Sequence, residues 1–244
     1  MISAFEHFRP HHQELRTRLL RSILALVICS TVAYIFKEQI TQLCMEPLFR
    51  AYPELEKLVY TKLTEAFISY IKISILTGCI LSFPYLLYQL WMFISPGLLE
   101  DEKKTAFVIV FWATMLFVSG GLFAFFIALP QILKFFMHYA GSNLIPMPKF
   151  GLYLTFVGRM ILTFSLAFEI PFLMVMVGKT GLVSSQYFRK KRLWFYLAIL
   201  ILAFMLTAGD ITATVLLAVP LFFLYEAGIL VGSILKKTNK RPAR

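Results

Sequence analysis

The sequence predicts an all-α membrane protein with several transmembrane helices, and three observations support this prediction. Of the 244 residues, 59% are hydrophobic and only 15% are charged. Residues 73–99 and 105–133 contain no Asp, Glu, Lys or Arg. Each of these runs is longer than the roughly 20 apolar residues that cross a bilayer. A soluble globular protein does not carry such runs, and the chain length suits one domain over residues 1–244.

The N-terminal segment, residues 1–20, precedes the first predicted span. Glu14 and Arg18 are four residues apart, so they can pair on one face of a helix. Residues 22–36 are uncharged, and the basic residues on both sides can snorkel, which lets this short run serve as a span. The segment lacks a signal-peptide cleavage site and contains acidic residues, so we expect the first apolar run to be retained as an anchor.

The next part of the chain is predicted to form two more spans, with one outer loop before them and a second outer loop after them. Residues 37–72 carry mixed charges and two prolines, and we expect short helices on the membrane surface there. The second span is predicted at 73–93 and the third at 105–129. The third is expected to end at Pro130, because proline cannot continue the hydrogen-bond ladder of a helix interior. Residues 130–149 are then a second outer loop.

The last three predicted spans are unusual in charge or length. The fourth, at 151–179, contains Arg159 and Glu169. The fifth and sixth, at 193–207 and 211–225, have only 15 residues each. At 1.5 Å per residue, a helix of this length reaches about 22 Å, against a hydrocarbon core of about 30 Å. Such a mismatch is met by local thinning of the bilayer or by association with other helices.

Lys and Arg predict the orientation of the six spans. With both termini on one side, that side holds fifteen of these residues, including a basic tail at 236–244, and the other side holds seven. Cytoplasmic loops carry the excess of Lys and Arg, so the N- and C-termini are predicted inside. The net charge of +11 has the same origin and does not indicate a nucleic-acid partner.

Motifs for catalysis, metals and cofactors are missing from the sequence. It has no HExxH, GxSxG, Walker A or Rossmann fingerprint. An intramembrane hydrolase would need a Ser–His pair or a second Asp near Asp210, and neither is present. The three cysteines have no CxxC spacing, so we interpret them as packing residues. We therefore predict a protein that is not an enzyme, with no catalytic residue, metal or cofactor.

Four carboxylates are the candidate functional groups. Glu169 is costly inside a bilayer, so it must face other helices, a cavity or a partner. Glu169 is either a neutral packing residue or a polar point on a water-accessible surface. Glu226 lies nearer a helix end, so it is either a second intramembrane carboxylate or a group solvated at the membrane interface. Glu14 and Glu102 lie among basic residues. They are either solvated surface charges or a site for an arginine guanidinium, whose planar fork can bond a carboxylate bidentately.

The segments around these carboxylates resemble the TatC family, the multispanning receptor subunit of the twin-arginine protein translocase. The most distinctive run is SFPYLLYQLWMFISPGLLEDEKK at 82–104. Five more segments stand in the family's order: HQELRTRL at 12–19, LTEAFISYIKIS at 63–74, AFEIP at 167–171, GLVSSQYFRKKR at 181–192 and AVPLFFLYE at 218–226. Each is weak alone, but six in order over nearly the whole chain are specific.

The resemblance implies a non-enzymatic receptor and core subunit that binds the twin-arginine signal peptides of folded cargo proteins. By match to the family motifs, Glu14 and Glu102 bind the two arginines. Arg16 belongs to the same N-terminal motif as Glu14. Gln89 and Phe93 belong to the run at 82–104 that also contains Glu102. The six helices are expected to form a concave, glove-like arrangement.

The resemblance also implies contacts within the membrane. Glu169 matches a membrane-embedded glutamate that faces the concave interior. The fifth and sixth helices match a docking surface for single-span TatA- and TatB-type subunits, with Thr207, Asp210 and Thr214 at or beside the contact. The family's usual T-P-P-D turn reads T-A-G-D at 207–210, and a Gln is common where Thr214 stands. Self-association and contacts with membrane lipids are expected as well.

Two expectations complete the sequence-based prediction. The lack of a transit peptide favours a bacterial cytoplasmic (inner) membrane over a thylakoid. Residues 1–20 are then cytoplasmic, and the loops 37–72 and 130–149 are periplasmic. The alternative function is a secondary transporter of small solutes, because such proteins also contain intramembrane carboxylates and short, interrupted helices.

Overall fold

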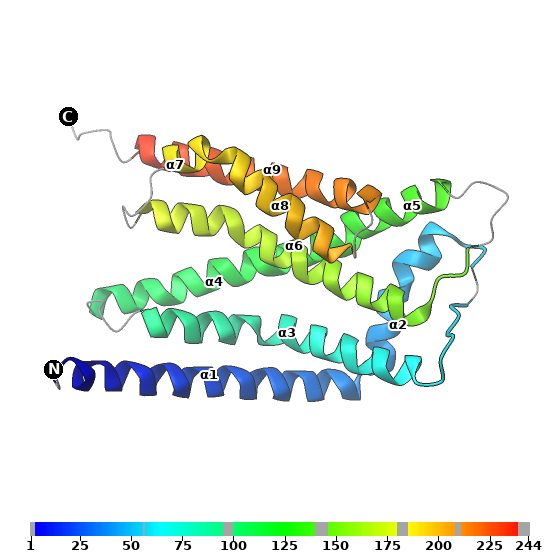
Figure 1. Cartoon of the computed structure of the whole chain (residues 1–244), viewed down its shortest axis with the longest axis horizontal. Helices are drawn as coiled ribbons and strands as arrows, with labels where there is room; N and C mark the ends of the chain where they lie inside the picture. Colours follow the sequence, from blue (N-terminus) through cyan, green and yellow to red (C-terminus); the bar gives the residue numbers. More distant parts are fainter. Residues whose placement is uncertain are drawn as a thin grey trace. The chain divides into compact units, whose positions relative to one another are not determined.

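Helices make up nearly all of this computed structural model (Figure 1). It describes all residues except 1–2, 56, 95–99, 140–145, 180–184, 208–210 and 239–244, and at some helical positions, including 3–12 and 100–107, only the backbone. Its helices are α1 (Ser3–Ile35), α2 (Lys37–Ala51), α3 (Glu65–Ile94), α4 (Glu100–Phe123), the π-helix η2 (Ala124–Ala128), α5 (Leu129–Tyr139), α6 (Phe150–Lys179), α7 (Ser185–Lys190), α8 (Arg192–Leu206) and α9 (Ile211–Thr238). The all-α prediction is confirmed.

The chain divides into two compact units. Three of the five boundaries between them fall inside α2, α4 and α6, and the other two lie between helices. Unit 1 consists of Met1–Met45, Val59–Met115 and Lys149–Gly158. Unit 2 consists of Glu46–Leu58, Leu116–Pro148 and Arg159–Arg244. Each unit has its own packing. That the whole chain forms a single domain stays a prediction.

Helices α1 and α3 form the body of unit 1. They contact each other along their length and run antiparallel (Figure 1). A Cβ atom added at Gly78 of α3 would lie 2.6 Å from the Cα of Ser30 of α1. The two backbones therefore approach closely at this point. Such small residues let transmembrane helices pack against each other, since the lipid supplies no hydrophobic driving force between them.

Hydrogen bonds around Glu65 close the other end of unit 1. The Glu65 carboxylate accepts from the backbone N–H of Thr61 at 2.9 Å and from that of Gly151 at 3.1 Å. The backbone N–H of Phe150 donates to the carbonyl oxygen of Val59 at 2.9 Å. These bonds hold the start of α6 against the start of α3, because backbone donors at a helix N-terminus need partners outside the helix.

Cys44 of α2 packs inside unit 1. Its side chain is buried, and its carbonyl oxygen accepts a hydrogen bond of 2.8 Å from the hydroxyl of Tyr153. Burial raises the pKa of the Cys44 thiol to about 11, so the thiol stays protonated at neutral pH and is unreactive. This agrees with the interpretation of the cysteines as packing residues.

Unit 2 is built on a second close approach, between α4 and α6. A Cβ atom added at Gly120 would lie 2.5 Å from the carbonyl oxygen of Phe164. The ring of Phe123 lies 5.5 Å from the ring of Phe164 and 5.5 Å from the ring of Phe168. In the same unit, α8 and α9 pack against each other as a helical hairpin (Figure 1).

Four helical stretches of the described chain are long and apolar enough to cross a membrane: Gln13–Ile35, Glu65–Phe93, Val108–Phe136 and Phe150–Val177. These stretches overlap the first four predicted spans. Two further apolar stretches are shorter, Arg192–Met205 and Leu217–Ser233, and they correspond to the predicted short fifth and sixth spans. The chain is therefore a membrane-embedded multi-pass protein. Six membrane crossings and the N-in, C-in orientation stay predictions.

The prediction that the third span ends at Pro130, with a loop over 130–149, is wrong. The helical path continues from α4 through the π-helix η2 into α5, which ends at Tyr139. In the π-helix the backbone N–H of Leu129 bonds to the carbonyl oxygen of Ala124. Pro130 follows directly after this π-helical turn, a local change in the hydrogen-bond ladder at which a helix accommodates a residue without an N–H donor.

Three other helices extend further than the sequence predicted. Residues 3–35 form one continuous helix, so the N-terminal segment and the first span are a single element. Helix α3 begins at Glu65 rather than at residue 73. Helix α9 does not stop at the carboxylate of Glu226 but continues to Thr238. The predicted range of the fourth span, 151–179, agrees with α6.

We expect Gly78→Ala to lower the free energy of unfolding by about 1–3 kcal/mol, because the added Cβ must push the backbones of α1 and α3 apart. Unfolding in detergent, followed by circular dichroism, measures the change. Gly158→Ala is the matched control within unit 1. Its Cβ would meet Cδ1 of Leu76 at 2.5 Å, the end of a flexible side chain that can rotate away. Equal losses in the two variants would contradict the close approach at Gly78.

Candidate functional site

A carboxylate and a guanidinium pair within one turn of α1. Arg18 donates to the same oxygen of Glu14, Oε1, through Nε at 3.0 Å and through Nη2 at 2.5 Å. The spacing of four residues places both side chains on one face of the helix. The predicted pairing of Glu14 with Arg18 is therefore confirmed. The Glu14 side chain keeps 30% of its exposure, whereas the Arg18 side chain keeps 16%.

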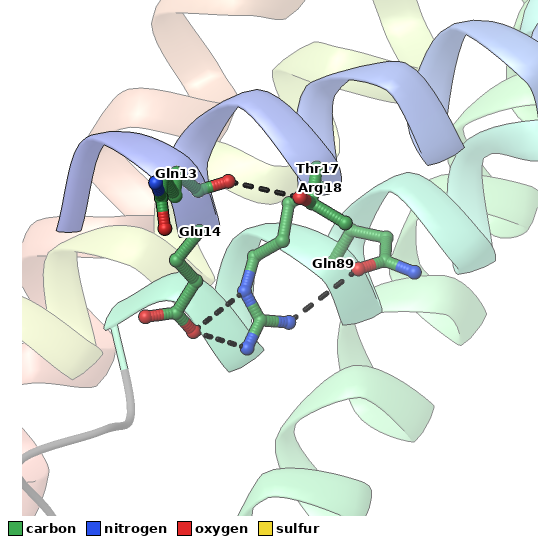
Figure 2. Close-up of polar contacts among 5 residues, drawn as sticks. All are labelled: Gln13, Glu14, Thr17, Arg18 and Gln89. Carbon is green, nitrogen blue, oxygen red and sulfur yellow. Dashed lines mark hydrogen bonds and ion pairs between the residues drawn. The ribbon is translucent and has the colours of Figure 1, made fainter. Parts of the chain in front are cut away.

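The same guanidinium reaches across to α3 (Figure 2). Nη1 of Arg18 donates to Oε1 of Gln89 at 3.5 Å, a long hydrogen bond. Gln89 is buried, and its amide nitrogen donates to the hydroxyl of Tyr85 at 2.6 Å. Glu14, Arg18, Gln89 and Tyr85 thus form one hydrogen-bonded chain, which we call the Glu14 cluster. It links two helices at the end of unit 1 where α1 begins.

The register of the two helices explains why Arg18 meets Gln89. From the close approach of Gly78 and Ser30, Gln89 lies 11 residues further along α3 and Arg18 lies 12 residues back along α1. At 1.5 Å per residue these steps are about 17 Å and about 18 Å. Because the helices are antiparallel, the two positions remain level with each other.

Three other residues are predicted for signal-peptide binding: Arg16, Phe93 and Glu102. Arg16 is exposed on α1 and does not join the hydrogen-bonded chain, and Phe93 is half-buried near the end of α3. Glu102 belongs to the first turn of α4, but its side chain lies outside the described part of the structure. Sequence reasoning missed Tyr85, which carries no charge and no motif spacing of its own.

Glu169 is buried within unit 2. Its side chain keeps 5% of its exposure, and Oε1 has no hydrogen-bond partner among the described residues. Ser165, one helical turn earlier on the same face of α6, is also buried, and its hydroxyl has no partner there either. A buried carboxylate oxygen without a partner is costly. Both predicted alternatives for Glu169, a neutral packing residue and a polar point on a water-accessible surface, stay predictions.

Glu226 has close partners on α8. Its Oε2 accepts from Nη2 of Arg192 at 2.7 Å, and its Oε1 accepts a short hydrogen bond from the hydroxyl of Tyr196. The ring of Phe195 stacks on that of Tyr225, with 5.1 Å between centroids. Glu226 therefore joins α9 to α8.

Two of the residues predicted to dock partners touch each other. The hydroxyl oxygens of Thr207, which follows the last residue of α8, and Thr214 in α9 are 2.7 Å apart. Thr214 is buried. The third residue, Asp210, lies outside the described chain. Among the described residues, no group of three or more His, Cys, Asp and Glu side chains could hold a metal ion.

Comparisons with known proteins agree on one family. The family model described as Sec-independent protein translocase protein (TatC) matches residues 10–220. A TatC of Desulforapulum autotrophicum is 36% identical, covering 94% of this chain and 85% of its own length. One of Aquifex aeolicus is 34% identical, covering 94% and 96%. A crystal structure of the twin-arginine translocase receptor TatC superposes with a TM-score of 0.85 at 34% identity, covering 92% of this chain and 98% of that one.

We expect Arg192→Met to lower the free energy of unfolding by about 1 kcal/mol, because it leaves the Glu226 carboxylate without its ion pair while both groups stay partly solvated. A double-mutant cycle with Glu226→Gln, measured by thermal unfolding in detergent, isolates the pair. The double variant should recover part of the loss. Additive losses would show that the two side chains do not interact.

Proposed function

This chain belongs to the TatC family of Sec-independent protein translocase proteins, and we propose that its Glu14 cluster contacts the twin-arginine signal peptide of folded cargo proteins. The chain is a non-enzymatic subunit of the twin-arginine translocase. This assignment displaces the alternative of a solute transporter.

The observation that carries the proposal is the state of the Glu14 carboxylate. It already binds a guanidinium through two nitrogens, at 3.0 and 2.5 Å, so its position and orientation suit an arginine side chain. Charge-assisted hydrogen bonds of this kind are about twice as strong as neutral ones. The carboxylate is also partly exposed, which leaves it accessible to a peptide.

Glu102 is the proposed second carboxylate. Helix α4 follows α3 in the chain, and its first turn, with Glu102, comes after the end of α3 that carries Gln89. Two arginines in sequence would then each find a carboxylate, one on α1 and one on α4. Arg16, Gln89 and Phe93 complete the proposed contact surface, by their match to the family motifs.

The membrane-embedded groups have proposed roles in the same process. The apolar segment of the bound peptide is proposed to enter the membrane near Glu169, whose unpartnered Oε1 could accept a hydrogen bond from the peptide or a partner. Helices α8 and α9 are proposed to dock TatA- and TatB-type subunits through the region of Thr207, Asp210 and Thr214. The receptor is proposed to self-associate and to lie in a bacterial cytoplasmic membrane, in contact with its lipids.

Peptide binding tests the receptor role. We expect Glu14→Gln to weaken binding of a twin-arginine signal peptide by roughly 10- to 100-fold, because a charged hydrogen bond contributes about 1.5–3 kcal/mol. Glu102→Gln should have a similar effect. Calorimetric titration of purified receptor in nanodiscs measures both.

The control for this experiment is Glu46→Gln. Glu46 also pairs with an arginine four residues away, Arg50, but on the exposed surface of α2, so its loss should leave peptide binding unchanged. If Glu14→Gln and Glu102→Gln bind the peptide as tightly as the unmodified chain, the receptor proposal fails.

Cysteine labelling tests the proposed topology of six spans with both termini inside. In a chain whose own cysteines are replaced by serine, a membrane-impermeant maleimide added outside should label Glu54→Cys and Asp210→Cys but not Glu102→Cys. Asp210 is the sharper test, because it lies between α8 and α9 in the chain. It becomes accessible from outside only if these two helices cross the membrane. Labelling of Asp210→Cys from the cytoplasmic side alone would overturn the six-span arrangement.

A further inference from the structure

We infer that Arg18 is a specificity-determining residue of the receptor, because its guanidinium occupies the Glu14 carboxylate in the free protein and only another guanidinium competes with it effectively. The inference rests on the proposed function of Glu14. It adds a role for a residue that belongs to the receptor itself and that acts before any peptide arrives.

Among the described residues, Arg18 engages only one of the two oxygens of the Glu14 carboxylate. Both Nε and Nη2 of Arg18 bond to Oε1 of Glu14, and no described residue bonds to Oε2. Figure 2 shows this second oxygen on the side away from Arg18. A fork-to-fork pair would have used both oxygens. The internal arginine therefore holds the carboxylate at one oxygen and leaves the other for a second donor.

Arg18 is anchored on its inner side, away from Oε2 of Glu14. Nη1 reaches the buried Gln89, which Tyr85 supports in turn. Arg18 is also less exposed than Glu14, at 16% against 30%. The guanidinium is therefore held by the second helix as well as by the carboxylate. Because Arg18 is on the same helix, one turn from Glu14, its guanidinium is always present next to the carboxylate at a high effective concentration.

An incoming side chain must therefore compete with an arginine that is already in place. A peptide guanidinium presents a planar fork, so it can bond Oε2 and take over part of Oε1 at the same time. A lysine ammonium is a compact and strongly hydrated point charge that cannot match this bidentate geometry. Both cations are also repelled by the charge of Arg18. Arg18 thus makes the Glu14 carboxylate, which by itself would attract any cation, selective for arginine.

The chain contains a matched pair that lacks these features. Arg50 and Glu46 have the same spacing of four residues on α2, but their side chains keep 70% and 44% of their exposure. No described side chain holds Arg50 from a second helix. This pair offers the same local chemistry without the anchor.

The experiment compares the affinities of a twin-arginine and a twin-lysine signal peptide, otherwise identical, for the receptor in nanodiscs. With Arg18→Gln we expect the twin-lysine peptide to bind roughly tenfold tighter than it binds the unmodified receptor, with a much smaller gain for the twin-arginine peptide, because the competing guanidinium is gone. The ratio of the two affinities therefore falls. Arg18→Lys should give an intermediate ratio, and Arg50→Gln should leave the ratio unchanged.

Two outcomes would overturn the inference. The first is an unchanged ratio in Arg18→Gln. The second is an equal weakening of both peptides in Arg18→Gln and Arg18→Lys, which would assign Arg18 a structural role only. Unfolding temperatures are recorded for each variant, and Arg18→Lys carries the test if Arg18→Gln does not fold. A failure of the receptor proposal looks different, since Glu14→Gln would then bind the twin-arginine peptide normally.

Discussion

The close approach of α1 and α3 at Gly78 and Ser30 is the constraint on which the candidate site depends. With no room for a Cβ atom between the two backbones, the helices have one preferred crossing point. That point sets the register, because a slip of one helix past the other would bring a side chain into the contact. The register in turn places Arg18 beside Gln89, at a point about 17 Å along the helices from the contact of Gly78 with Ser30. A packing contact between a glycine and a serine thus positions a polar site about three helical turns away.

Glu169 and Glu226, both in unit 2, show that two buried or partly buried carboxylates of one protein can have very different surroundings. Glu226 has an ion pair and a tyrosine hydroxyl as partners, so it joins α8 to α9. Glu169 is more deeply buried, and one of its oxygens has no partner among the described residues. An ionisable group without partners is costly in a membrane and marks a functional position. The contrast supports a role for Glu169 outside the packing of its own unit.

The proposed role of Arg18 changes the way the Glu14 surface is understood. An acidic residue near a membrane surface attracts cations of every kind, and its selectivity then has to come from geometry. Here the receptor supplies one arginine of its own, bound to one oxygen of the carboxylate and held from behind by a second helix. Specificity then arises partly from exclusion, which is a common feature of selective recognition.

The sequence by itself determined the features that depend on neighbours along the chain. Long charge-free runs identified the membrane-embedded helices, the spacing of four residues paired Glu14 with Arg18, and the range of α6 was predicted to within one residue. The family resemblance also came from ordered local motifs. In each case the signal lies within one helix, where periodicity and composition act directly.

Only the tertiary structure decided the features that join distant residues. Arg18 and Gln89 are 71 residues apart, and their contact depends on the crossing point of two helices rather than on any local pattern. Pro130 was expected to end a helix, but it follows directly after a π-helical turn and the helical path continues. Glu226 was expected to mark a helix end, but α9 continues past it, and its carboxylate pairs with Arg192, 34 residues away. The physical reason is the same throughout: a charge or a proline has a local cost, and partners brought by the fold decide whether that cost is met.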